Sequence, residues 1–210
     1  MTKLPIVVAT GNPHKVEEMR KQLGQWFELS PLPKNYISPV EDGGSFAANA
    51  LIKAQTAAQR LGTLCVADDS GLCVDALDGA PGIYSSRYAG IEGDDAANNA
   101  KLLLALADVP HDQRGAHFVC ALSIAAPSGE LLALQGRFDG SIGYEAVGED
   151  GFGYDPLFVL PSGRTSAELL PEVKQRISHR GQALARLEKA ITEGDLLDRC
   201  RAAAGDALRG

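Results

Sequence analysis

The chain contains 210 residues, of which 45% are hydrophobic and 22% are charged. This length suits one domain and is well below that of two full enzyme domains, and the ordinary composition excludes wholesale disorder. Twenty basic against 27 acidic residues give a formal net charge of −7. Because no cluster of lysines and arginines stands out, we expect no nucleic-acid partner.

The sequence also indicates where the protein works. Its apolar runs fall short of the roughly 18 residues of a membrane helix, and its first residues do not form the apolar region of a signal peptide. The cysteines include no C-x-x-C pair and lie mostly in apolar runs, which favours reduced core thiols. We therefore expect a cytoplasmic protein with no membrane partner; these cysteines are Cys65, Cys73, Cys120 and Cys200.

Strands and helices alternate in the first half of the chain. A β-branched run at residues 4–10 predicts a buried strand, and a Gly-Asn-Pro turn then starts a helix with Val16, Met19 and Leu23 on one face. An alanine-rich helix is predicted at residues 45–62, with a serine N-cap and a glycine after its end. This order predicts an α/β unit. Further strands are expected at 27–29 and 64–67.

The second half is predicted to combine a long β-hairpin with helices. Residues 118–126 and 131–138 alternate around a Pro-Ser-Gly turn, which is typical of a hairpin. Asp94 opens a helix that reaches about residue 106. Strands are expected at 72–77 and 157–160, helices at 166–176 and 178–193, and a small Ala/Arg/Gly tail after them.

The first candidate site is T-G-N-P-H-K at residues 10–15. A strand end, a glycine and a helix N-terminus supply free backbone N–H groups and a positive dipole end, and Lys15 lies in the first helical turn. The segment therefore predicts an anion cradle. An ordinary capped helix with a solvated lysine is the alternative, because neither a Walker motif nor G-x-G-x-x-G is present.

The second candidate is Asp68-Asp69-Ser70-Gly71, which follows a predicted buried strand. Carboxylates at the carboxyl end of such a strand lie where α/β folds bind ligands, and carboxylate oxygen suits Mg²⁺. Adjacent residues of an extended chain point to opposite sides, so we expect one of the two aspartates to face the ligand. A β-turn is the alternative, since Asp, Ser and Gly all favour turns.

Two polar features accompany the alanine-rich helix. The acidic segment E-D-G-G at residues 41–44 precedes it, and a solvated loop is the alternative to a binding role. Lys53 lies in mid-helix, one turn after Asn49 on the same face. This pair either directs polar groups at a ligand or remains on the surface, as lysines usually do.

Two further segments lie near the C-terminus. In G-F-G-Y-D-P at residues 151–156, the glycines allow close approach of the backbone to a ligand, and an exposed ring can stack on a planar base. A tight turn with buried aromatics explains the composition equally well. In S-H-R-G at residues 178–181, His179 and Arg180 offer hydrogen-bond donors at a helix start, unless Ser178 is simply an N-cap.

Taken in order, these segments resemble the non-canonical purine NTP pyrophosphatases, the inosine/xanthosine triphosphate pyrophosphatase family. Six segments in the family's order, over nearly the whole chain, are far more specific than any one of them. They are A-T-G-N..K at 9–15, S-F..N-A..K-A at 45–54, A-D-D-S-G-L at 67–72, G-A-P-G-I-Y-S.R-Y at 79–88, G-F-G-Y-D-P-L-F at 151–158 and S-H-R-G-Q-A at 178–183.

The resemblance implies an elongated, two-lobed α/β fold with a central mixed β-sheet flanked by helices and a nucleotide cleft between the lobes. It implies a single domain over residues 1–210 and a homodimer. It further implies Mg²⁺-dependent hydrolysis of ITP, dITP, XTP and dXTP to the monophosphate and pyrophosphate, which removes deaminated purines from the nucleotide pool.

The resemblance also implies roles for individual residues. Asp69 is the catalytic carboxylate and a metal ligand, and Glu41, with Asp42 beside it, matches the second metal-binding acid. His179 and Arg180 read the base. The triphosphate is held by Thr10, Gly11, Asn12, Pro13, His14, Lys15 and Lys53, while Ser70, Phe152, Gly153, Tyr154, Asp155 and Lys174 contact or border the nucleotide.

The chemistry of the substrate agrees with these roles. A triphosphate carries about four negative charges, so an acidic protein needs Mg²⁺ and aimed cations such as Lys15 and Lys53. Arg180 has only donors, which match the 6-keto group of hypoxanthine and oppose the 6-amino group of adenine. Guanine shares the 6-keto group, so rejection of GTP requires a different contact.

Two other functions remain open from the sequence. One is a pyrophosphatase that acts on modified pyrimidine or methylated nucleotides. His179 and Arg180 favour a keto purine as the substrate instead. The other is a regulatory nucleotide-binding module without turnover. The intact pair Asp68 and Asp69, together with the two lysines, favours an enzyme, because a pure binder needs no metal-held base.

Overall fold

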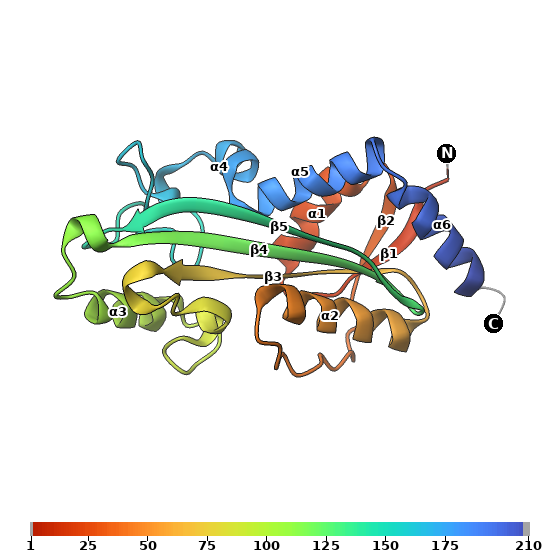
Figure 1. Ribbon diagram of the computed structural model, residues 1–210, viewed down its shortest axis with the longest axis horizontal. Coiled ribbons are helices and arrows are strands. Elements are labelled where there is room, and N and C mark those ends of the chain that lie inside the picture. Colours follow the sequence, from red (N-terminus) through yellow and green to blue (C-terminus); the bar gives the residue numbers. More distant parts are fainter. Residues whose placement is uncertain (1, 208–210) are drawn as a thin grey trace. The chain divides into compact units, whose positions relative to one another are not determined.

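The alternation predicted for the first half of the chain is confirmed by a computed structural model, which describes residues 2–207. The first strand starts where the β-branched run starts, and the helix after it begins at the proline of the Gly-Asn-Pro turn. In chain order these elements are β1 (Leu4–Val8), α1 (Pro13–Leu23), β2 (Phe27–Pro31), α2 (Phe46–Leu61) and β3 (Cys65–Val74) (Figure 1).

The first three strands form a parallel arrangement with helices on both sides. β1 lies between β2 and β3, and Val7 is in register with Cys65. α1 buries Val16, Met19 and Leu23, as its spacing predicted. α2 runs along the opposite face from α1 (Figure 1). This is the predicted α/β unit.

α2 has the ends that its sequence predicts. The Ser45 side chain accepts a hydrogen bond from the backbone N–H of Ala48 at 3.2 Å, which satisfies one free donor of the first turn. Gly62 ends the helix in the left-handed region, with φ of 66°. The buried side of α2 consists of small residues, so it packs closely on the sheet; these are Asn49, Ala50, Ala54, Ala57 and Ala58.

The remaining elements complete a mixed sheet. Within residues 2–207 the sheet has six strands in the order β2-β1-β3-β4-β5-β6, and β5 pairs with β6 in antiparallel fashion. The α/β class and the mixed sheet predicted from the sequence are thus confirmed. The elements are α3 (Asp95–Ala105), β4 (Gly115–Ala126), β5 (Gly129–Ile142), β6 (Phe158–Val159), α4 (Pro171–Ile177), α5 (His179–Thr192) and α6 (Leu196–Ala207).

The chain divides into two compact units. Unit 1 comprises Met1–Asp69, Ala121–Gln135 and Ala183–Gly210, and unit 2 comprises Ser70–Cys120 and Gly136–Gln182. The division falls inside continuous elements, because β3, β4, β5 and α5 each begin in one unit and end in the other. Each unit is therefore described by its own contacts below.

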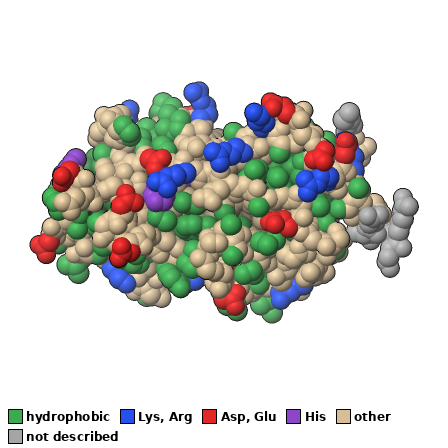
Figure 2. Space-filling view, viewed as in Figure 1, with side chains coloured by type: hydrophobic (Ala, Val, Ile, Leu, Met, Phe, Trp, Pro, Cys, Tyr) green, Lys and Arg blue, Asp and Glu red, His purple; other side chains and the backbone are tan. Residues whose placement is uncertain are grey.

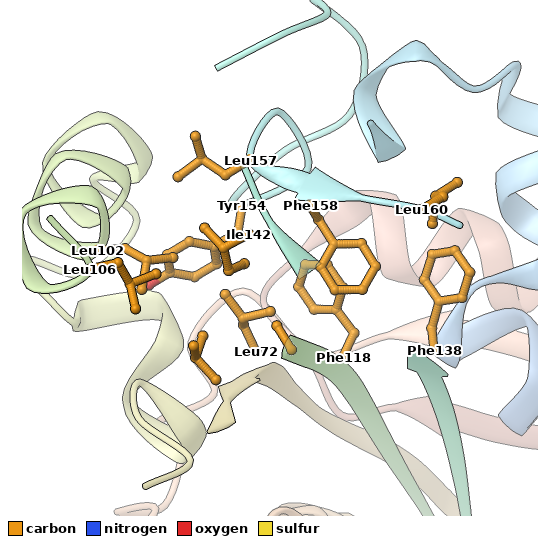
Figure 3. Packing of buried hydrophobic residues seen from close by; sticks show 12 residues of the cluster. Leu72, Leu102, Leu106, Phe118, Phe138, Ile142, Tyr154, Leu157, Phe158 and Leu160 are labelled. Atoms are coloured by element: carbon orange, nitrogen blue, oxygen red, sulfur yellow. The ribbon is translucent and has the colours of Figure 1, made fainter. Parts of the chain in front are cut away.

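Unit 2 has an aromatic core of its own. The Phe118 and Phe158 rings lie 4.6 Å apart, and the Phe138 ring lies 5.4 Å from that of Phe158. The Tyr154 ring lies among aliphatic side chains that include Leu102 of α3 (Figure 3). These contacts join α3, β4, β5 and the loop before β6 into one packed body.

Some sequence predictions were wrong in detail. Residues 64–67 and 72–77 were predicted as separate strands, but β3 continues from Cys65 to Val74. The helix predicted at 166–176 is a short 3₁₀ turn at Ser166–Glu168 followed by α4, because a proline at the start of α4 begins a new helix. The expected tail forms α6, which buries Leu196 and Cys200 one turn apart.

The expectations about membrane and thiols can be compared with the described part of the chain. None of its helices has both the length and the apolar character of a membrane span. The four cysteines lie within this part and form no disulfide there, and Cys65, Cys120 and Cys200 are buried. On the face drawn in Figure 2, acidic and basic side chains are interspersed rather than gathered by sign.

Candidate active site

Asp68 and Asp69 lie within strand β3 rather than in a turn, so the β-turn alternative was wrong. The alternation of a strand directs them to opposite faces of the sheet, as predicted. Lys15 of α1 pairs with Asp68 at 2.8 Å between Nζ and Oδ2. On the other side, Lys53 of α2 pairs with Asp69 at 3.0 Å between Nζ and Oδ1. Asp68 is therefore paired with a lysine of α1, and Asp69 with a lysine of α2.

The predicted anion cradle lies beside these carboxylates because of the strand order. Ala9, just after β1, donates from its backbone N–H to Val66 of β3 at 2.7 Å. The chain then turns at residues 10–12, where the Asn12 N–H donates to the Thr10 hydroxyl oxygen at 3.2 Å. α1 starts at Pro13, so its free N–H groups lie at this turn. The His14 side chain lies outside the described part.

A pocket of about 340 Å³ opens next to this turn in unit 1. One side of it consists of the cradle and the start of α1. The other side is the proline-rich segment after β2, which adds the polar groups of a lysine, a tyrosine and a serine. The lining residues are Thr10, Gly11, Pro13, Val16, Pro31, Leu32, Pro33, Lys34, Tyr36 and Ser38.

Lys53 also connects Asp69 to the acidic loop before α2. Its Nζ lies 3.0 Å from Glu41 Oε2 as well as 3.0 Å from Asp69 Oδ1. Glu41 is half-buried, whereas Asp42 is exposed. Of the two acids that the sequence offered, the structure brings Glu41 into the charged group around Asp69.

Asn49 holds the same loop from the helix side. Its Nδ2 donates to Asp69 Oδ2 at 3.1 Å, and its Oδ1 accepts from the Gly43 N–H at 2.9 Å. A Cβ atom at Gly43 would lie 2.7 Å from Asn49 Oδ1, so this approach needs glycine. Asn49 is 1% exposed and shares a helix face with Lys53, as the sequence predicted.

The electrostatics of this group suit a reactive carboxylate. Burial raises the pKa of Asp69 above its usual value, and the opposing effects of Lys53 and Asn49 do not cancel it. Burial acts to lower the pKa of Lys53, but the surrounding carboxylates outweigh burial and raise it. The ammonium is therefore held charged beside a carboxylate of increased basicity, which favours proton acceptance.

The donor set fits Mg²⁺ bound together with a phosphate. Mg²⁺ in phosphate-transfer sites is held by one or two carboxylates, with phosphate oxygens and water as the remaining ligands. Asp69 and Glu41 supply two such carboxylates, and both lie 3.0 Å from the ammonium of Lys53. The described residues contain no group of three or more His, Cys, Asp or Glu side chains arranged as a metal cage.

The loop at residues 151–156 has exposed and buried members in unit 2. The Phe152 side chain is exposed, with the Lys174 ammonium 5.1 Å from its ring centroid. Lys174 also pairs with the buried Asp155. The Tyr154 hydroxyl donates to the Ser85 carbonyl at 2.8 Å, and burial raises its pKa. Of the two aromatic residues in this loop, Phe152 is thus exposed and Tyr154 is buried.

The start of α5 carries the predicted base-reading pair. The His179 ring stacks on Phe118 at 4.9 Å between centroids, and Arg180 is 5% exposed. A Cβ atom at Gly181 would lie 1.8 Å from the Gln175 carbonyl oxygen, so α4 and α5 meet closely only with glycine there. Ser70, also a predicted contact, follows Asp69 in β3 and is the first residue of unit 2.

Sequence reasoning missed the α3 residues that contact these loops. Asn98 accepts from the Ala89 N–H at 2.7 Å and donates to the Ser86 carbonyl at 3.3 Å. Asp95 and Asn99 contact the backbone of Gly153. The available signal for these residues was the run of polar side chains at the start of α3. Such a run does not indicate which loop each side chain contacts.

Comparison with protein families now identifies the chain. The model of the Ham1 family matches residues 6–190. This chain belongs to the Ham1 family.

Named relatives and solved structures agree with this assignment to the Ham1 family. The chain is 52% identical over 193 residues to a dITP/XTP pyrophosphatase of Exiguobacterium sibiricum, covering 90% of this chain and 98% of that protein. It is 47% identical over 192 residues to a dITP/XTP pyrophosphatase of Mycobacteroides abscessus, with 88% and 93% covered. A HAM1 protein structure from Coxiella burnetii matches with a TM-score of 0.83 and 41% identity, covering 91% of this chain and 100% of that one.

Proposed function

We propose that this Ham1-family protein hydrolyses ITP, dITP and XTP to the monophosphate and pyrophosphate, and so removes deaminated purine nucleotides. The observation that supports the reaction most is the Asp69 carboxylate, which is buried, of raised pKa, and contacted by Lys53 and Asn49. The relatives named dITP/XTP pyrophosphatase, which are 52% and 47% identical to this chain, support deaminated purine nucleotides as the substrate class.

We assign the triphosphate to unit 1. Lys15 and Lys53 neutralise phosphate charge, and the N–H groups at the start of α1 donate to phosphate oxygens. Thr10, Gly11, Asn12, Pro13 and His14 form this cradle. Mg²⁺, bound by Asp69 and Glu41, would reduce the negative charge of the triphosphate and orient it.

Asp69 acts in the bond-breaking step. A water molecule attacks the α-phosphorus and loses its proton to the Asp69 carboxylate, which acts as the general base. The new bond joins the water oxygen to the α-phosphorus. The bond from the α-phosphorus to the bridging oxygen breaks, and pyrophosphate leaves with the electron pair. Lys53 stabilises the charge that develops on the leaving group.

We assign the base to groups of unit 2. Phe152 offers an exposed ring for stacking, and His179 and Arg180 supply donors for the 6-keto oxygen. Ser70 and Lys174 complete the contacts with the nucleotide, while Gly153, Tyr154 and Asp155 shape the loop that carries the ring. We further propose that the protein is a single-domain homodimer of the cytoplasm.

A substrate panel tests this function. ITP, dITP, XTP, ATP and GTP are each incubated with the protein and Mg²⁺, and pyrophosphate and orthophosphate are detected separately. We expect pyrophosphate from the first three and little product from ATP or GTP. In H₂¹⁸O, the label is expected in the monophosphate, because water attacks the α-phosphorus. Orthophosphate as the main product, or label in pyrophosphate, would refute the proposed reaction.

The rival with the same reaction type acts on modified pyrimidine nucleotides. Adding pyrimidine triphosphates to the panel separates the two. Faster turnover of these than of ITP would replace the purine assignment while leaving the role of Asp69 intact.

A further inference from the structure

The backbone of Gly153 is held on both sides by helix α3. The Gly153 N–H donates to Asp95 Oδ2 at 2.7 Å. The Gly153 carbonyl accepts from Asn99 Nδ2 at 2.9 Å. Asp95 and Asn99 are four residues apart, so they lie on the same face of the helix. Both polar groups of one loop residue are thereby fixed to one rigid element, all within unit 2.

The loop needs such support because of its own sequence. Gly151 and Gly153 have φ of 90° and 62°, in the left-handed region that glycine adopts readily. Glycines on both sides of Phe152 also give the unrestrained chain many conformations. The bonds inside the loop join Phe152 to Asp155: the Phe152 N–H donates to Asp155 Oδ2 at 2.8 Å, and the Asp155 N–H donates to the Phe152 carbonyl at 3.3 Å.

Between these restrained neighbours, Phe152 remains open. Its side chain is 48% exposed, although it is a large apolar ring. The Lys174 ammonium lies 5.1 Å from the ring centroid. At Gly151 a Cβ atom would come within 2.8 Å of the same ammonium, so the glycine permits this approach. An exposed ring on a fixed backbone suits stacking with a planar group.

The hydrogen bond from Asn99 to Gly153 comes with a cost in folding free energy. Its Oδ1 is buried and has no hydrogen-bond partner among the residues that the structure describes. Such an acceptor is unfavourable by roughly 1–3 kcal/mol. Removing the amide therefore removes one hydrogen bond and one unsatisfied acceptor together. The stability of the fold should change little, whereas Gly153 loses one of its two hydrogen bonds to α3.

We propose that Asp95 and Asn99 are positioning residues for the purine base, which act by fixing the Phe152 ring in its stacking orientation. This inference rests on the proposed function, since it assigns the base to Phe152. Preorganisation of the ring reduces the ordering that binding requires. Because the base binds equally in the ground state and in the transition state, the effect falls on KM rather than on kcat.

The experiment places a fluorescent reporter at the ring. Trp26 is the single tryptophan of the sequence, so Trp26→Phe with Phe152→Trp gives a protein whose emission comes from position 152 alone. Asn99→Ala and Asp95→Ala are made in this background, and Asp95→Asn retains a carbonyl acceptor for the Gly153 N–H. Lys101→Met is the matched control, because Lys101 donates from the same helix to the Tyr88 carbonyl instead.

We expect lower anisotropy of the reporter in both alanine variants, with values like the parent in Asp95→Asn and Lys101→Met. In the chain with Phe152 restored, Asn99→Ala should raise KM for ITP by about tenfold, the effect of one hydrogen bond with a neutral partner. The kcat should stay within about twofold. The midpoint of urea unfolding should match that of Lys101→Met.

Unchanged anisotropy in both alanine variants would overturn the proposal, because the loop would then not depend on α3. A mobile reporter with an unchanged KM for ITP would also overturn it, since the ring would not bind the base. Failure of the parent protein to release pyrophosphate from ITP would instead refute the proposed function, and with it the assignment of a base to this loop. The anisotropy readout uses no substrate, so the two failures are distinguishable.

Discussion

The charged group of unit 1 and the aromatic loop of unit 2 are built in different ways. Asp69, Lys53 and Asn49 stand on the regular elements β3 and α2, whose packing determines where each side chain points. Phe152 stands on a glycine-rich loop that α3 and α4 hold by contacts with its backbone and with Asp155. Side chains on strands and helices are positioned more precisely than those on loops.

This difference suits the two tasks that we assign. Bond breaking depends on the position of a base relative to the phosphorus to within a fraction of an ångström, and buried strand residues supply such positions. Stacking on a base requires a ring that is exposed and held in one orientation, and a loop restrained by α3 provides this. Substitutions in unit 1 should therefore lower turnover of every substrate, and substitutions in unit 2 should alter the choice among them.

The largest effect is expected at Asp69. Asp69→Asn keeps the size of the side chain but removes its charge and basicity. We expect kcat for ITP to fall by on the order of 10³-fold, or about 4 kcal/mol in the barrier. The neighbour Asp68→Asn is the matched variant and should lose less, since Asp68 faces α1. An Asp69→Asn protein with a normal circular dichroism spectrum and activity within tenfold of the wild type would contradict the assignment.

A second large effect concerns the stability of unit 2. Arg114 is 1% exposed and donates to the carbonyls of Leu106, Ile142 and Gly143, each at 2.8 Å. Arg114→Met removes the guanidinium donors from all three carbonyls at once, and of these the Leu106 carbonyl still accepts from the Val109 N–H. We therefore expect a loss of about 3 kcal/mol in the free energy of unfolding. Denaturant unfolding measures it.

Arg137→Met is the control for this loss. Arg137 forms an exposed ion pair with Asp139 at 2.7 Å, and such pairs contribute about 0–1 kcal/mol. Equal losses for the two arginines would show that burial and carbonyl contacts do not determine the stability of this region.

A smaller effect separates the two acids of the loop before α2. Glu41→Gln removes the carboxylate that pairs with Lys53 and that we assign to Mg²⁺. Activity at limiting Mg²⁺ should therefore fall by about 10–100-fold, with partial recovery at higher Mg²⁺ concentration. Asp42→Asn should stay within about twofold, because Asp42 is exposed. The larger loss in Asp42→Asn would assign the metal to Asp42 instead.

The sequence predicted unit 1 better than unit 2 for a physical reason. Periodicity and caps are local signals, and they correctly gave α1, α2 and the face shared by Asn49 and Lys53. The strand β3 was divided in error at Asp68–Gly71, because Asp, Ser and Gly favour turns in isolation. In the fold, hydrogen bonds to neighbouring strands outweigh this preference.

In unit 2 the informative contacts link residues far apart in the chain. Asn99 reaches Gly153 across 54 positions, and Tyr154 reaches Ser85 across 69. No spacing rule connects such residues, so the sequence showed that the loop was unusual but not what holds it. The roles of His179 and Arg180 likewise came from resemblance and remain predictions.

The ratio of kcat/KM for ITP to that for ATP, measured in Arg180→Ala and in Lys53→Met, tests the division of tasks most directly. Arg180→Ala removes the donors that we assign to the 6-keto oxygen, so the ratio should fall by at least about tenfold, with GTP remaining a poor substrate. Lys53→Met should lower both values by a common factor, on the order of 10²-fold, and leave the ratio unchanged. A common loss for ITP and ATP in Arg180→Ala, with no change in their ratio, would make Arg180 a phosphate ligand and contradict the account.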